Sequence, residues 1–96
     1  MRLMIHAPTD AALDRARAHA AALLASLPDA EVEIVVDNDG ACAALDRPDP
    51  ASDGMLVFCG LSLRAMDRAA GGAPVVAAAV RYIAERQAAG WAYMRA

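Results

Sequence analysis

Short apolar runs and longer amphipathic stretches alternate along the 96 residues of this chain. The short runs are bounded by proline, glycine or acidic residues and several are rich in β-branched side chains, which is typical of buried strands. They predict strands at residues 2–7, 31–37, 55–59, 73–76 and 91–95. The fourth run, "APVV", is so brief that it is also compatible with the start of a helix.

The stretches between the runs carry helical signals. Thr9 is placed to cap a first helix, with Asp10 at its positive end, and Pro28 ends that helix. A shorter helix is expected in "NDGACAALD", and two more at residues 61–69 and 78–89, the last with Gly90 as its C-terminal cap. Apolar residues at steps of three and four predict that one face of the first helix is buried: Leu13, Ala16, Ala20, Leu23, Leu24 and Leu27.

Strands that are separated by helices favour right-handed parallel crossovers. The pattern therefore predicts an α/β fold, a three-layer α/β/α sandwich around a mainly parallel five-stranded sheet. The chain length suits a single domain over residues 1–96, and the proline-rich segment 47–54 is expected to be a surface loop.

Composition excludes several classes of function. The formal net charge is -3, no basic patch is present, and the 4% of aromatic residues are not interleaved with arginines, so we expect no nucleic-acid partner. All nine basic residues are arginine. The lack of lysine excludes Schiff-base chemistry and a phosphate-binding P-loop.

Neither a membrane span nor a leader peptide is expected. The stretch "AAGGAPVVAAAV" is too short, and too broken by its glycines and Pro74, to cross a bilayer. The start "MRLMIHAPTD" reaches polar residues too soon for a signal-peptide core. We therefore expect a cytoplasmic protein in which Cys42 and Cys59 are free thiols.

Polar and reactive residues follow the predicted strands. Ligands of open parallel sheets bind at the carboxyl ends of the strands, where the sequence places His6, Asp37, Asn38 and Cys59. Gly60 has no side chain, so the first N–H groups of the next helix can approach the sulfur, and a helix N-terminus favours the thiolate. Cys59, aimed outward at this edge, is the candidate nucleophile.

Other interpretations of these residues stay open. A free cysteine often packs as a small apolar residue, which applies to Cys59 and more strongly to Cys42, although Cys42 could serve as a resolving thiol. His6 is a candidate ligand or base, or a hydrogen-bonded structural histidine, and His19 is expected on an exposed flank.

Metal and nucleotide sites have no support. The two histidines and two cysteines lack the close paired spacing of a zinc site, so no metal is expected. No glycine fingerprint follows the first strand, so no dinucleotide cofactor is expected either.

Three segments carry a resemblance to a known family: "VEIVVDNDGACAAL", "VFCGLSLRAM" and "VVAAAVRYIAERQAAGWAYMRA". Together they resemble the DsrE/DsrF-like family of small sulfur-relay proteins over nearly the whole chain. The resemblance implies a flavodoxin-like domain that forms homotrimers or homohexamers, with the cysteine after the third strand, here Cys59, carrying sulfur as a persulfide. Asp37 and Asn38 stand where relatives tend to place an asparagine-glycine pair.

Two functions follow as hypotheses. In the first, Cys59 takes sulfur from a donor persulfide and passes it to an acceptor thiolate, while the backbone of Gly60, Leu61 and Ser62, together with Arg64, holds the anion. In the second, the protein is a non-catalytic oligomer that binds a small ligand or a partner protein in the same pocket. Trp91 and Tyr93 alternate onto one face of the last strand, where they would suit a subunit interface.

Overall fold

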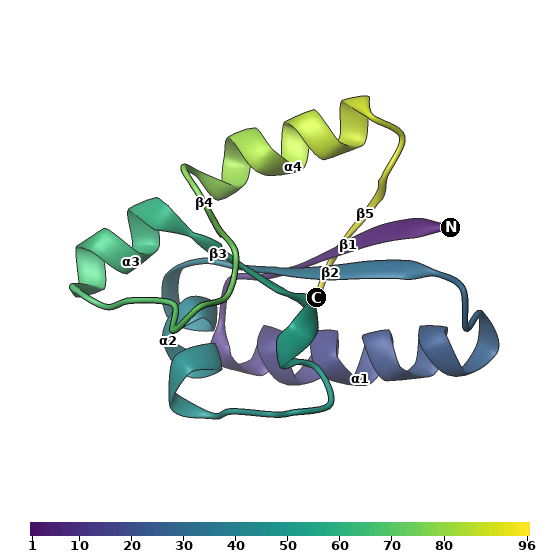
Figure 1. Ribbon diagram of the computed structural model, residues 1–96, viewed down its shortest axis with the longest axis horizontal. Coiled ribbons are helices and arrows are strands. Elements are labelled where there is room, and N and C mark those ends of the chain that lie inside the picture. Colours follow the sequence, from purple (N-terminus) through teal and green to yellow (C-terminus); the bar gives the residue numbers. More distant parts are fainter.

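Five parallel strands form one sheet in the order β4-β3-β2-β1-β5 (Figure 1). The computed structural model describes all 96 residues. The strands are β1 (Arg2–Ala7), β2 (Glu31–Val36), β3 (Leu56–Cys59), β4 (Val75–Val76) and β5 (Ala92–Arg95). The helices are α1 (Asp10–Ser26), α2 (Asn38–Asp46), α3 (Gly60–Met66) and α4 (Ala79–Ala88), with a short 3-10 turn, η1 (Asp53–Met55), before β3.

Helices cover both faces of the sheet, which confirms the predicted flavodoxin-like three-layer α/β/α sandwich (Figure 1). Side chains of α1, α2 and α3 share one core with alternate residues of the central strands, among them Ile5, Ile34 and Phe58. On the opposite face α4 alone covers a smaller core of six buried residues: Met4, Val35, Val57, Cys59, Ala79 and Trp91. We call this side the α4 face.

The strand order has a reversal next to β1. The chain proceeds outward from β1 through β2 and β3 to β4, and then α4 carries it back across the sheet to place β5 on the free side of β1. In open parallel sheets, the carboxyl ends of the strands beside such a reversal form a crevice. Here that crevice lies between the ends of β1 and β5.

Predicted element boundaries are correct to within three residues, and the first helix begins as expected. The Thr9 hydroxyl accepts the N–H of Ala12 at 3.0 Å.

Two expectations about packing are wrong. Leu27 is 44% exposed, because α1 ends at Ser26 and the helical periodicity ends with it. Trp91 is only 7% exposed, because it precedes β5 and packs into this chain's own core on the α4 face.

Trp91 lies in a cationic and aromatic cluster under α4. The guanidinium carbon of Arg86 stands 4.7 Å from the Trp91 ring centroid, and that of Arg2 stands 6.0 Å away. Arg86 also donates to the Tyr82 hydroxyl at 2.8 Å and to Glu33 at 3.2 Å, while Tyr82 donates to Glu33 at 2.6 Å. These contacts join α4 to the amino-terminal half of β2.

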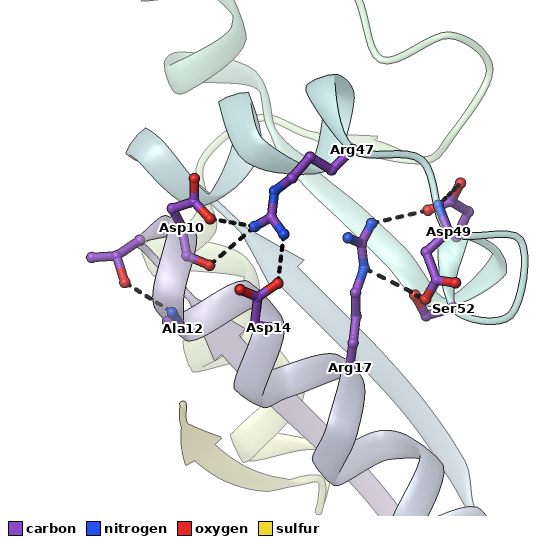
Figure 2. Close-up of polar contacts among 9 residues, drawn as sticks. Asp10, Ala12, Asp14, Arg17, Arg47, Asp49 and Ser52 are labelled. Atoms are coloured by element: carbon purple, nitrogen blue, oxygen red, sulfur yellow. Dashed lines mark hydrogen bonds and ion pairs between the residues drawn. The ribbon is translucent and has the colours of Figure 1, made fainter.

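Arginines tie the predicted surface loop to α1 (Figure 2). Arg17, whose side chain is 12% exposed, lies 3.3 Å from Asp53 and 3.8 Å from Asp49. Arg47 bonds Asp14 at 2.6 Å and also pairs with Asp10. The loop is therefore held closely against the helix, and its Ser52 is buried.

A close backbone approach fixes α2 against the end of β1. A Cβ placed on Gly40 would lie 1.9 Å from the carbonyl oxygen of Ala7, a distance at which atoms overlap. Only glycine fits this position, so α2 can pack directly beside the strand end that carries His6.

None of the helices has both the length and the apolar character that a bilayer crossing needs.

Candidate functional site

The structure brings three predicted site residues to one edge and one face of the sheet. His6, Asp37 and Cys59 lie at or just beyond the carboxyl ends of β1, β2 and β3. They come two residues after Met4, Val35 and Val57, which belong to the core on the α4 face. Side chains two residues apart in a strand point to the same face, so all three are directed to the α4 side. The register pairs Val36 with Phe58, so the next residues, Asp37 and Cys59, come from adjacent strand ends.

The expectation that Cys59 points outward is wrong. Cys59 is only 5% exposed, because its side chain faces α4 and the start of that helix covers it. The backbone N–H of Ala79, the first residue of α4, donates to the Cys59 sulfur at 3.4 Å. The thiol is thus enclosed between the beginnings of α3 and α4.

Several donors surround the sulfur. Burial raises the pKa of the Cys59 thiol, but the N–H groups of Ser62, Ala79 and Leu61 and the Ser62 hydroxyl outweigh this effect, so the pKa lies below its ordinary value. This arrangement stabilises a thiolate by hydrogen bonds and not by a neighbouring cation.

Gly60 makes this enclosure sterically feasible. A Cβ at Gly60 would stand 2.8 Å from the carbonyl oxygen of Val76, too close for an ordinary contact. Because Gly60 has no side chain, the link between β4 and α4 can approach the start of α3. This approach brings the N–H of Ala79 to the Cys59 sulfur.

Ser62 connects the cysteine to the second strand end. Its hydroxyl oxygen accepts the N–H of Asn38 at 2.8 Å. Asn38 has a φ of 48°, in the left-handed region that asparagine tolerates better than most residues. Asn38 thus contributes its backbone to the site, through Ser62, in the position where the sequence placed a binding residue.

His6 and Asp37 form a pair that extends to Tyr93. His6 Nε2 lies 3.0 Å from Asp37 Oδ1, and His6 Nδ1 lies 3.0 Å from the Tyr93 hydroxyl. A carboxylate only accepts hydrogen bonds, so in the neutral ring Nε2 carries the proton and Tyr93 donates to Nδ1. Asp37 makes no capping bond to α2, since its carboxylate serves His6 instead.

Tyr93 is a site residue that the sequence analysis assigned only to an interface. It stands 87 residues from His6, and no local motif links the two. The signal that finds it is sheet register: Tyr93 pairs with Met4 in the parallel β1–β5 ladder, so it shares the α4 face with His6.

The two other predicted site residues, Leu61 and Arg64, are exposed on α3. Arg64 makes no side-chain hydrogen bond or ion pair, and Leu61 is 53% exposed, while its N–H helps to lower the pKa of Cys59. That Arg64 helps to bind the anionic sulfur group therefore stays a prediction.

Cys42 and His19 lie on other parts of the molecule. Cys42 is on α2, on the far side of the sheet from the α4 face, with its sulfur 3.5 Å from Asp46 and 3.6 Å from Arg68. The structure does not bring Cys42 next to Cys59, so Cys42 is not positioned to form a disulfide with it as a resolving thiol. His19 is exposed on α1, as expected.

A solved structure shares this fold. The chain resembles the protein of unknown function MTH1491 from Methanobacterium thermoautotrophicum, with a TM-score of 0.79 and 26% sequence identity. The similarity covers 99% of this chain and 98% of that one. Neither a family model nor a curated protein matches the sequence. The comparison thus supports the fold over the full length of the chain, and it assigns no function.

Proposed function

We propose that this protein is a sulfur carrier in which Cys59 accepts and passes on sulfur as a persulfide. The observation that supports this function best is the hydrogen bond from the Ala79 N–H to the Cys59 sulfur at 3.4 Å, at a strand end where the first turn of α3 also lowers the pKa of the thiol. Such donors favour an anionic sulfur, which is the form that attacks a persulfide or polysulfide. The resemblance of the cysteine segment to DsrE/DsrF-like proteins supports the same chemistry.

The reaction needs no external oxidant. The Cys59 thiolate attacks the outer sulfur of a donor persulfide, a new S–S bond forms, and the donor leaves as a thiolate that takes up a proton. Cys59 then carries the transferred sulfur. In the second step an acceptor thiolate attacks that outer sulfur and Cys59 leaves as the thiolate, which the same donors stabilise.

The burial of Cys59 restricts the donor. With 5% of the residue exposed, a bulky reagent cannot reach the sulfur in the conformation described. Inorganic polysulfide is small and anionic, so we expect it to load Cys59 where a large thiol reagent fails.

The test is mass spectrometry of the intact protein after incubation with inorganic polysulfide, with and without a reducing agent. We expect the wild type and Cys42→Ser to gain sulfur that reductant removes, and Cys59→Ser to gain none. Loading of Cys59→Ser at the wild-type level would overturn the proposal, because the sulfur would then reside elsewhere.

The alternative is a non-catalytic homo-oligomer that binds a small ligand or a partner protein. The burial of Cys59 favours it, since a structural cysteine is also buried.

In either case we propose assembly as a homotrimer or homohexamer. The exposed apolar side chains Leu61, Val75 and Val80, from α3, β4 and α4, offer surface for such contacts. Light scattering over a wide concentration range tests the assembly, and a single chain mass throughout would contradict it.

A further inference from the structure

A cavity of about 320 Å³ lies beside α4, at the crevice between the ends of β1 and β5. Its polar lining is His6, Asp37, Gln87 and Tyr93, and its apolar lining is Val80, Ile83 and Ala84. We propose that this cavity binds a small organic ammonium ion with an apolar tail. The proposal is independent of sulfur transfer, because neither Cys59 nor its donors line the cavity.

At the polar end of the cavity, the hydrogen-bonded residues Tyr93, His6 and Asp37 offer acceptors and leave no donor of their own free. The Tyr93 hydroxyl donates its hydrogen bond to His6 Nδ1, and the His6 Nε2–H donates to Asp37, so both donors are used within the chain. The Tyr93 oxygen keeps a lone pair. The second carboxylate oxygen of Asp37 has no hydrogen-bond partner in the chain.

These acceptors match an ammonium group. A primary ammonium has three N–H donors, and the Tyr93 oxygen, the Asp37 carboxylate and the Gln87 amide oxygen supply three acceptors. Asp37 is the only formally charged side chain in the lining when His6 is neutral, so a cation is favoured there and an anion is opposed. The Tyr93 ring adds an aromatic surface of the kind that attracts cations.

The remaining wall selects an apolar tail. Val80, Ile83 and Ala84 come from successive turns of α4 and face the cavity together. Val80 is 77% exposed and Tyr93 39%, so the cavity is open to solvent and a ligand can enter without movement of the helix. A volume near 300 Å³ is at the lower end for small-molecule sites, which suits an amine of a few carbon atoms.

The test is a titration followed by NMR, with n-pentylammonium as the probe and pentanoate as the anion of matched size. We expect pentylammonium to cause saturable shifts in the amide signals of Val80, Ile83 and Tyr93, and pentanoate to cause none. Asp37→Asn should weaken binding by at least about tenfold, because it removes a charge-assisted hydrogen bond. Asp39→Asn, a neighbouring acid outside the cavity, should bind as the wild type does.

Ala84→Phe provides a variant that leaves every polar group in place. It fills the cavity, so it should abolish binding, whereas Cys59→Ser should retain it. The proposal is overturned if pentylammonium gives no saturable shifts, if pentanoate binds equally well, or if Ala84→Phe binds as tightly as the wild type. Equal weakening by Asp37→Asn and Asp39→Asn would also overturn it, because the effect would then be one of overall charge.

Discussion

The N–H of Ala79 donates to the sulfur of Cys59 at 3.4 Å, joining the first residue of α4 to the last residue of β3. Through this bond the docking of α4 and the protonation of the thiol depend on each other. A thiolate is a better acceptor than a thiol, so ionisation of Cys59 should strengthen the attachment of the helix start.

Removal of the Ser62 hydroxyl should raise the pKa of Cys59. The hydroxyl is one of the groups that lower this pKa, and it also accepts the N–H of Asn38. In a Cys42→Ser background, the pH dependence of thiolate absorbance would shift upward in Ser62→Ala. Ser26→Ala is the control, because that hydroxyl bonds only to the Ala22 carbonyl. An unchanged titration in Ser62→Ala would contradict the role of the hydroxyl.

The stability that Cys59 contributes should depend on pH. Its folded-state pKa is below the ordinary value of 9.0, so the thiolate stabilises the fold fully above the unfolded-state pKa and loses this contribution as the pH falls through the folded-state pKa. The difference in unfolding free energy between wild type and Cys59→Ser should therefore grow as the pH rises toward 9.0. Urea unfolding across this range measures it, and a difference that stays constant with pH would refute the prediction.

Gly40→Ala should destabilise the protein by at least about 2 kcal/mol. The new Cβ would lie 1.9 Å from the Ala7 carbonyl oxygen, and relief requires α2 to move away from the end of β1. Gly54→Ala is the control, because nothing lies within 4 Å of a Cβ there. Thermal unfolding compares the two variants, and equal midpoints would show that α2 is free to shift.

The two arginines of Figure 2 should differ in their effect on stability. Arg17 is 12% exposed and lies close to Asp49 and Asp53, so Arg17→Met removes the positive charge that faces these two acids and should cost about 2 kcal/mol. Arg47→Met should cost less, since Arg47 is 41% exposed and water screens its pairs with Asp10 and Asp14. Denaturant midpoints for the two variants test the ranking, which a larger loss at Arg47 would reverse.

The sequence predicted those parts of the fold that depend on local signals. Strand and helix positions followed from apolar runs and from caps such as Thr9, and alternation of the elements led to the parallel three-layer sandwich. The position of β5 beside β1 has no local signal, because it depends on which side of the sheet the last crossover takes. The sequence therefore left the strand order undetermined.

Side-chain direction at the site was harder to predict than position. Cys59 and His6 stand at strand ends as expected, but whether the thiol faces solvent depends on where α4 begins in space. The contact between His6 and Tyr93 depends on the β1–β5 register in the same way. Both features arise from packing between segments far apart in the chain, which periodicity does not encode.

Trp91 is the chain's single tryptophan, and it is buried under α4 with Arg86 stacked 4.7 Å from its ring centroid. All indole fluorescence of the protein therefore comes from one place, the surface between α4 and the sheet. Detachment of α4 would expose the ring to water and move its emission to longer wavelength, even while the rest of the fold stays intact. The protein thus contains an intrinsic optical probe of the same helix whose first N–H contacts the Cys59 sulfur.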